Sequence, residues 1–520
     1  MKKLKYILLT GFLALSVLFH PQVIAQTLNT PASIELTNSM ALWINTQNAA
    51  GLAIDKMSHY NEVSLFYGLG NGKYKLCADG EKERLFGFNT NGALSVGQMF
   101  LWGDFSYKDE FLSNTQFNTN QIKVRRDVPY YVVDPNLSDW MRRTYQMNMK
   151  VASQKLFNLL FLGINAEYQN NVGAKQVDPR STVYSYDMNV KPSVIFAFTQ
   201  KHHIGLTGIY YNYKSNSTTV NSDNQVSQTV YILKGLGYNY IGNVGGLSSL
   251  NPYFNIGNRL GGELGYSYNT AKMDIVVSAG YSKKVEDVAH TPTRPRMEGS
   301  TIEKNQNVAL QLLMKGHFLH KLMAVYNNNQ IDGVEYIQEL DRTYEVQRWI
   351  TKFKSIRSSF KDIDFDITYD FIAKAGNEYN WKVGAFFNYH KLSDIYYLPL
   401  STMDYRATTY GVDAKYNFHF GANSRLLIGV NGALKSVNDD AKYVYGGPNP
   451  ESPIIKDFME KDFAMATNGN TKFGGEATFS TPVSKTKFTS LYFKLACDYY
   501  KASKIDVSRT ITHFSLGLTF

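Results

Sequence analysis

Cysteine and proline are both rare in this chain of 520 residues, which has 2 cysteines and 14 prolines. Cys77 and Cys497 stand far apart, and neither belongs to a C-x-x-C pair. A disulfide framework is therefore excluded, although a single bridge between the two stays open. The scarcity of proline leaves long stretches in which every backbone N–H is free to join a ladder of hydrogen bonds.

Long apolar runs are missing after residue 25, and so are runs of five or more basic residues. A membrane-spanning helix needs roughly 20 apolar residues in a row, so a helical membrane protein is excluded. The formal net charge is +10. Lysine and arginine are nevertheless scattered among acidic residues, which argues against nucleic acid as a partner.

The first 25 residues have the order of a secretory signal peptide. Lysines at 2, 3 and 5 precede an apolar stretch over 6–19, and Val23–Ala25 offers a cleavage site that contains no cysteine for lipidation. A membrane anchor is the alternative, but the apolar stretch is shorter than a spanning helix requires. The pattern predicts export of the chain and cleavage near Ala25.

Aromatic residues and glycine are abundant, with 37 tyrosines, 31 phenylalanines and 39 glycines. From residue 61 onward, apolar and polar residues alternate with a period of two, which is the period of a strand with one apolar face. In 362–371, for example, Ile363, Phe365 and Ile367 alternate with aspartates. A soluble sandwich alternates in the same way, so the decision depends on loop lengths and strand lengths.

Short connections alternate along the chain with long polar stretches. The long stretches are 109–139, 171–181, 215–258, 287–302, 331–359, 391–404 and 438–464. The strands between connections run about 10–15 residues, which exceeds the usual strand of a soluble sheet and is long enough to cross a bilayer when tilted. Tight turns at one end and long loops at the other are typical of bacterial outer-membrane β-barrels.

We therefore predict an all-β fold, a single transmembrane antiparallel β-barrel of about 18 strands with a range of 16–20. The strands are expected at 61–75, 82–95, 99–108, 140–153, 156–170, 182–197, 203–214, 259–269, 273–286, 303–315, 320–330, 360–372, 380–391, 405–418, 424–437, 465–480, 487–499 and 506–520. Residues 26–60 precede the barrel, which covers 61–520. Residues 229–240 are expected to form hairpin structure inside the single external loop 215–258.

The last strand, 506–520, places Phe514, Leu516, Leu518 and the terminal Phe520 on one face. Its ending THFSLGLTF, with the signal peptide and the loop pattern, resembles an uncharacterised group of Bacteroidota outer-membrane β-barrel proteins. The resemblance implies the outer membrane of a Gram-negative bacterium, contact with outer-membrane lipid, and recognition of these four residues by the barrel-assembly machinery. It implies no substrate. TonB-dependent receptors differ, because their luminal plug is several times longer than 26–60.

The segment 26–60 contains the run Asn48-Ala49-Ala50-Gly51-Leu52. This run resembles the Asn-Pro-Ala-Gly-Leu motif of fatty-acid-transporter-like barrels, with alanine in place of proline. The resemblance implies a hatch inside the lumen that gates the passage of a hydrophobic ligand. The alternative is a periplasmic tail with one helical turn.

The predicted inward faces of the strands carry many charges, which a dry core would not tolerate and a water-filled lumen does. The lumen-lining candidates are Arg142, Lys150, Asp362, Asp364, Asp366, Asp370, Lys382, His390, Arg425 and Lys435. The four aspartates of this set either line a cation path or pair with cations on adjacent strands, such as Lys382.

Residue patterns of enzymes and metal sites are missing from the sequence. Neither G-x-S-x-G nor H-E-x-x-H occurs, and no histidine has a nucleophile and an acid at a recognisable spacing. No His, Asp and Glu cluster has the spacing of metal ligands. We therefore expect no enzyme activity, no metal and no cofactor.

Three functions remain open. The first is a channel or transport component that passes a polar solute through a charged lumen. The second is a surface scaffold whose long loops dock a lipoprotein, a transporter or a glycan, and the third is the hatch-gated transport of a hydrophobic ligand. The loop residues of the type found at binding hot spots are Arg125, Arg126, Tyr130, Tyr131 and Trp349.

Overall fold

The structure is a computed structural model that describes residues 29–520, apart from 58, 224, 247–249, 292–294, 344, 346, 422–423 and 484–488. The predicted signal peptide and its cleavage site near Ala25 lie outside the described residues. Both cysteines are free thiols, so Cys77 and Cys497 do not form a bridge.

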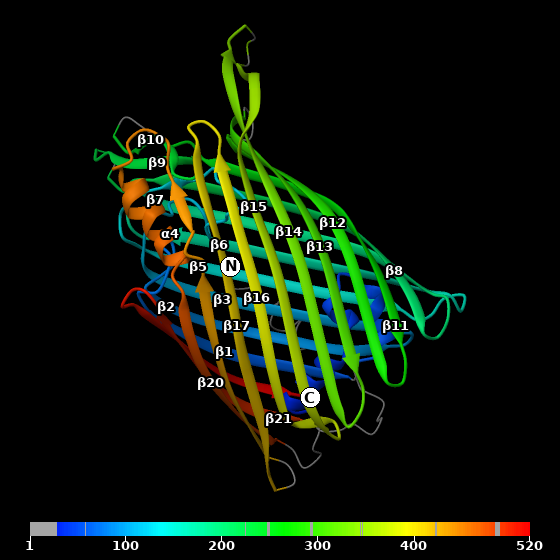
Figure 1. Ribbon diagram of the computed structural model, residues 1–520. Helices are drawn as coiled ribbons and strands as arrows, with labels where there is room; N and C mark the ends of the chain where they lie inside the picture. Colours follow the sequence, from blue (N-terminus) through cyan, green and yellow to red (C-terminus); the bar gives the residue numbers. More distant parts are fainter. Residues whose placement is uncertain are drawn as a thin grey trace, which may run out of the picture.

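Eighteen antiparallel strands close into one barrel, as predicted (Figure 1). They are β1 (Tyr60–Gly72), β2 (Lys82–Val96), β3 (Met99–Thr115), β5 (Ser138–Ser153), β6 (Leu160–Lys175), β7 (Arg180–Ala197), β8 (His202–Val220), β11 (Tyr253–Asn269), β12 (Met273–His290), β13 (Arg296–Met314), β14 (Phe318–Asp341), β15 (Arg348–Ala375), β16 (Glu378–Tyr396), β17 (Ser401–Phe420), β18 (Ser424–Val437), β20 (Asn470–Pro482), β21 (Ser490–Ala502) and β22 (Ser508–Thr519). Because β1 pairs with both β2 and β22, the sheet has no free edge around its circumference.

Alternate residues of each strand face outward and inward. On β22, Leu516 and Leu518 are 50% and 38% exposed, whereas Thr519 is completely buried and its hydroxyl donates to the carbonyl oxygen of Asn29. The N-terminal residues therefore lie on the inner side of the sheet, and the leucine face of β22 points outward. This is the apolar-out pattern of a barrel surrounded by lipid.

The two ends of the barrel differ in their connections. Eight short turns and both barrel termini lie at one end, which we call the turn end, where the backbone N–H of Asn61 donates to the carbonyl oxygen of Phe520. The other nine connections, which include the long loops 116–137, 221–252 and 438–469, lie at the opposite end, which we call the loop end.

Strands at the loop end are longer than predicted. The stretches 287–302, 331–359 and 391–404 were expected as loops, but most of their residues belong to β12 through β17. The hairpin of β14 and β15 rises beyond the rest of the loop end (Figure 1). Backbone ladders and cross-strand pairs hold a ribbon together outside the membrane, where no apolar outward face is needed. The sequence there lacks the lipid-facing pattern that identified the other strands.

The remaining elements lie at the two ends of the barrel. They are α2 (Pro31–Met40), η1 (Trp43–Asn45), η2 (Ala49–Gly51) and α3 (Leu52–Asp55) before the barrel, and β4 (Val132–Val133), β9 (Gln228–Gly235), β10 (Tyr238–Val244), β19 (Lys442–Val444), η3 (Ile454–Met459) and α4 (Glu460–Ala466) in the loops. The hairpin of β9 and β10 is the one expected within 215–258. Among the described residues, no helix has the length and apolar character needed to cross a membrane.

Candidate functional site: a lumen closed at both ends

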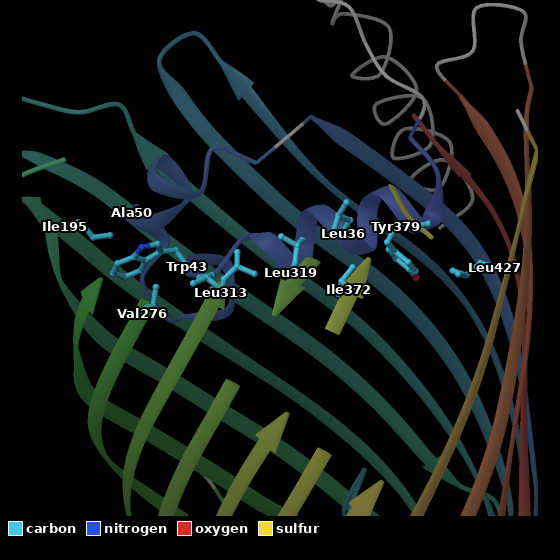
Figure 2. Packing of buried hydrophobic residues seen from close by; sticks show 12 residues of the cluster. Leu36, Trp43, Ala50, Ile195, Val276, Leu313, Leu319, Ile372, Tyr379 and Leu427 are labelled. Carbon is cyan, nitrogen blue, oxygen red and sulfur yellow. The ribbon is translucent and has the colours of Figure 1, made fainter. Parts of the chain in front are cut away.

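The described residues of the segment 29–57, which we call the N-terminal segment, pack inside the turn end of the barrel. Leu36, Trp43 and Ala50 of this segment form one buried apolar cluster with residues of seven barrel strands (Figure 2). The wall residues of the cluster are Ile195, Val276, Leu313, Leu319, Ile372, Tyr379 and Leu427. The indole of Trp43 is only 1% exposed, so this contact covers apolar surface that would otherwise face the lumen.

Local sequence explains the shape of the N-terminal segment. Thr30 caps α2 in a reciprocal capping box with Ser33, and Pro31 occupies the first turn, where its missing N–H costs nothing. Asn48 caps η2 through its side chain and donates to the carbonyl oxygens of Val194 and Leu206 on the wall.

The run 48–52 fits against the wall because of one glycine. A Cβ atom at Gly163 of β6 would lie 2.2 Å from the backbone nitrogen of Ala50, so any larger residue would displace the segment. On the other side, the hydroxyl of Ser193 accepts a hydrogen bond from the same nitrogen at 3.2 Å.

Charged side chains add two further polar contacts between the N-terminal segment and the wall. Lys150 of β5 donates its ammonium to the carbonyl oxygens of Ile44 and Thr46, at 2.6 and 2.9 Å. Glu35 accepts from the Tyr379 hydroxyl at 2.7 Å and pairs with Lys415 at 2.9 Å. The contacts approach the segment from widely separated strands of the barrel.

Asp55 stabilises the fold of the N-terminal segment from within. Its carboxylate accepts from the backbone N–H groups of Trp43 and Ile44, at 3.2 and 2.9 Å, and so satisfies donors at the start of η1. Burial raises the pKa of Asp55 to about 7, although the two hydrogen bonds and the charge of Lys150 oppose the shift.

The loop end is closed by three loops that fold together. The described parts of 116–137, 221–252 and 438–469 form what we call the loop layer, in which β4, β9 and β10 make a small sheet. Phe117, Leu233 and Phe458, one from each loop, share an apolar cluster. Leu236 packs against Ile331, Phe360 and Tyr396 of the wall.

Two consecutive arginines fasten the loop layer to the barrel wall. Arg125 pairs with Glu286 of β12 at 2.7 Å and with Asp127 of its own loop at the same distance. Arg126 pairs with Asp362 of β15 and Asp394 of β16. Lys284 of β12 completes the arrangement through ion pairs with Asp127 and with Glu303, the latter at 3.0 Å.

The external-loop candidates therefore lie mostly inside the molecule. Tyr130 and Tyr131 are 1% and 7% exposed in the loop layer, and both arginines form ion pairs with buried or half-buried carboxylates. These four side chains do not form a free outer surface, because their loop folds back into the barrel mouth. Trp349 lies on the projecting hairpin, where its ring is covered by the guanidinium of Arg296 at 5.1 Å.

The four predicted lumen aspartates each have a partner on a neighbouring element. Asp364 contacts His390 at 2.7 Å, Asp366 accepts from the Asn388 amide at 2.7 Å, and Asp370 pairs with Lys382 at 3.0 Å. Asp362 pairs with Arg126, as described above. In the described part of the chain, no group of three or more His, Cys, Asp or Glu residues is arranged to hold a metal ion.

The other lumen candidates are distributed along the wall. Arg425 pairs with Glu378 at 2.9 Å at the turn end, and Lys435 donates to the carbonyl oxygen of Ala466 in the loop layer at 2.7 Å. The guanidinium of Arg142 lies 5.7 Å from the Trp140 ring. The N-terminal segment and the loop layer are the two closures of the lumen. Lys150 contacts the first and Lys435 the second. The alternation of polar and apolar residues along β5 and β18 does not predict either contact.

Comparison with known proteins identifies the family. The model of a family of unknown function, DUF6850, matches residues 49–520. The chain belongs to this family. No curated protein matches the sequence.

Several solved structures are similar to the chain at low sequence identity. They include the ferric preacinetobactin receptor BauA from Acinetobacter baumannii (9% identity, 89% of this chain and 80% of that chain, TM-score 0.41) and the FrpB iron transporter from Neisseria meningitidis (8%, 91% and 83%, TM-score 0.39). The outer membrane transporter YddB from Escherichia coli is similar as well (7%, 89% and 81%, TM-score 0.38).

Proposed function

We propose that this barrel is a transport component of the outer membrane that passes a polar solute through a gated, charged lumen. The supporting observation is that a wall of paired charges and amides lies between two closures, each held by polar contacts. In this proposal, the signal peptide is removed near Ala25, the loop end faces outward, and the turn end faces the periplasm.

The polar wall favours a polar solute over a hydrophobic ligand. Glu167 and Lys191 pair at 2.5 Å, and Lys415 pairs with Glu476 at 2.6 Å, both on inward faces. A hydrophobic ligand passing these groups would remove water from them without replacing their hydrogen bonds. The run 48–52 would then belong to a hatch that gates a polar solute. Its resemblance to fatty-acid-transporter-like barrels implies a hydrophobic ligand instead.

The closures are suited to act as gates because they can move without breaking the hydrogen bonds between the barrel strands. The ion pairs of Arg125 and Arg126 join a loop to the wall without taking part in strand pairing. Separating these buried pairs costs free energy, which water recovers in part when the loop lifts and both partners become solvated, while all eighteen strands remain hydrogen-bonded. The loop layer and the N-terminal segment would therefore move as units.

Potassium chloride conductance in planar bilayers tests this proposal. We compare the full mature chain with the Arg125→Ala/Arg126→Ala double variant, with a chain lacking 29–57, and with both changes combined. The combined variant is expected to conduct at least about tenfold more than the unaltered chain, because each change opens one closure.

The matched control is Arg143→Ala, which removes an exposed arginine from the outer face of β5 that pairs with Asp109 of β3 at 3.4 Å, outside the loop layer. Its conductance should equal that of the unaltered chain. A combined variant that inserts as a folded barrel and does not conduct would reject the proposed function.

A second candidate function is the docking of a surface partner on the projecting hairpin. Pairing of β13 with β14 stops at Val334, and pairing of β15 with β16 starts at Ser358, so the ribbon beyond them is held by only two strands. Ile337 and Phe353 are 64% and 59% exposed on it. Two-stranded ribbons with apolar side chains in water are marginally stable, which favours a lipoprotein, transporter or glycan that covers them.

Shortening this hairpin tests the second candidate. A variant in which 336–354 is replaced by an Asn-Gly turn keeps the barrel part of β14 and β15. If the hairpin is a docking site, a partner that copurifies with the full chain should be lost from this variant. The same partner retained on the shortened chain would exclude the hairpin as its site.

A further inference from the structure

A hollow of about 370 Å³ lies in the inner wall of the barrel on β1, β2, β3, β5 and β22. It is distinct from both closures, since none of its lining residues belongs to the N-terminal segment or the loop layer. Four lining residues, Ser64, Asn89, Ser106 and Gln146, are direct neighbours across four consecutive strands. They form a continuous lateral row of neutral polar side chains.

The row is rich in groups that both donate and accept hydrogen bonds. Hydroxyl and carboxamide side chains together offer donors and acceptors side by side. The Oδ1 atom of Asn89 is buried and has no hydrogen-bond partner within the described structure. An unpaired buried acceptor is costly, so a rotation of the Asn89 carboxamide that brings Oδ1 to a donor of a ligand in the hollow is favourable.

An aromatic ring borders the row. A Cβ atom at Gly87 of β2 would lie 2.2 Å from Cζ and 2.5 Å from Cε2 of Phe66. The ring of Phe66 therefore lies directly over the backbone of β2, in space that only a glycine leaves open. This arrangement keeps the ring against the wall, where it presents an apolar surface beside the polar row.

The charges that line the hollow are balanced. Asp104 and Lys108 stand two residues before and two residues after Ser106 on β3, so all three face the same side. One carboxylate and one ammonium give no net charge to attract an anion or a cation. A ligand that combines hydroxyl groups with an apolar ring face matches all three features of the site.

We propose that this hollow binds a neutral, hydroxyl-rich ring, such as one sugar unit of an oligosaccharide. Hydroxyl groups of the ring would donate to Asn89 Oδ1 and exchange hydrogen bonds with Gln146 and the two serines. The apolar C–H face of the ring would pack on Phe66. The inference rests on the proposed function in one respect, because it names the chemical class of the solute that the lumen passes.

Equilibrium binding of neutral trisaccharides to the full mature chain in detergent tests the inference. The probes are maltotriose, cellotriose and chitotriose, with triglycine as a polar probe of similar length that has no sugar ring. At least one trisaccharide should bind with a dissociation constant in the millimolar range or tighter, and at least tenfold more tightly than triglycine. Phe66→Ala and Asn89→Ala should each weaken this binding about tenfold.

The matched control is Phe86→Ala, which removes a ring of the same kind from the adjacent strand, where Phe86 is 50% exposed on the outer face. It should bind the trisaccharide like the unaltered chain, and all variants should keep heat-modifiable migration as evidence of a closed barrel. Absence of trisaccharide binding, or binding that Phe66→Ala and Asn89→Ala leave unchanged, would overturn the inference.

This outcome is independent of the test of the proposed function. Binding is measured on the full chain and on the combined variant, in which neither closure blocks entry of the trisaccharide, whereas the conductance test uses potassium chloride and no sugar. Conductance without trisaccharide binding would reject the sugar site alone, and binding without conductance would reject the gated passage alone.

Discussion

The ammonium of Lys150 donates to the carbonyl oxygen of Ile44 across 2.6 Å, and this contact joins a barrel strand to the N-terminal segment. The lysine side chain is buried, and its second hydrogen bond goes to Thr46 of the same segment. No carboxylate forms an ion pair with Lys150 among the described residues. The backbone of the N-terminal segment is therefore its principal hydrogen-bonding partner.

Lys150→Met should release the N-terminal segment while the barrel stays closed. The change keeps most of the apolar stem and removes both hydrogen bonds, each contributing about 1.5–3 kcal/mol because the donor is charged. Amide hydrogen exchange within 31–55 should accelerate by about tenfold or more. Lys435→Met, which removes the analogous contact to the loop layer, should leave exchange in 31–55 unchanged. If amide exchange in 31–55 is the same in the Lys150→Met variant as in the unaltered chain, then apolar packing alone holds the segment in place.

The seating of the N-terminal segment should weaken as the pH rises from about 4 to about 7. Asp55 has an ordinary carboxyl pKa of 3.8 when released and a pKa of about 7 when seated, so the seated form binds a proton more tightly throughout this window. Seating is therefore strongest below pH 4 and loses stability until Asp55 is fully ionised above pH 7. Lys150 and Asp274 are the charged groups of the wall that act on this carboxyl.

Hydrogen exchange in 31–55, corrected for the intrinsic pH dependence, measures this effect. Asp55→Asn keeps an oxygen acceptor for Trp43 or Ile44 and cannot ionise, so its exchange should be flat between pH 4 and 7. An equally steep dependence in Asp55→Asn would assign the effect to another group.

Arg126→Ala should loosen the loop 116–137. Asp394 is 5% exposed, and Arg126 is its only ion-pair partner in the described part of the chain. Breaking one side of such a buried pair costs about 3–5 kcal/mol. Protease cleavage in 116–137 of the folded barrel should become measurably faster than in the unaltered chain. The Arg143→Ala variant serves as the reference, and identical cleavage in both would contradict a fastening role for Arg126.

Leu516→Arg should impair assembly into the membrane. Leu516 is 50% exposed on the outward face of β22, and an arginine on the lipid face of a barrel costs about 2–4 kcal/mol near the bilayer centre. His513→Arg on the inward face of the same strand should assemble normally. The heat-modifiable fraction in isolated membranes measures both. Equal assembly of the two variants would contradict the assignment of the faces of β22. The recognition of Phe514, Leu516, Leu518 and Phe520 by the barrel-assembly machinery stays a prediction.

Neutralising Asp364 and Asp366 should make an opened barrel less selective for cations. In the Arg125→Ala/Arg126→Ala chain lacking 29–57, the added changes Asp364→Asn/Asp366→Asn remove two negative charges from the inner wall. The reversal potential in a potassium chloride gradient should shift toward anion permeation. Asp109→Asn on the outer face is the control. An unshifted potential would show that these aspartates do not line the conducting path.

The strands were predictable from the sequence because lipid imposes a simple pattern on them. On 362–371 and on 506–520 the apolar set faces outward at every second position, which fixes both the strand and its orientation. Where the ribbon of β14 and β15 leaves the membrane, an apolar outward face is no longer needed. The sequence of 331–359 therefore lacks the alternation and indicates a loop. Turns were predictable for a related reason, since they interrupt the alternation sharply.

The closures were not predictable to the same degree. Tyr130 and Tyr131 have the composition of exposed loop residues, and only the packing of three loops, distant in sequence, shows that they are buried. The partners of Lys150 are backbone carbonyl groups, which carry no residue-specific signal. The Asn89 carboxamide is one of many in the strands, and whether its oxygen is paired depends on the register of β2 with β1 and β3.

The contact between Glu35 and Lys415 has a consequence for biogenesis. The two residues are separated by 380 positions, and Leu427, which belongs to the same apolar cluster as Leu36, comes later still. The part of the chain that is synthesised first thus finds its full set of neighbours only when nearly the last strands have joined the sheet. The N-terminal segment is therefore covered only after the barrel has closed. Its accessibility distinguishes folded barrels from incompletely folded ones.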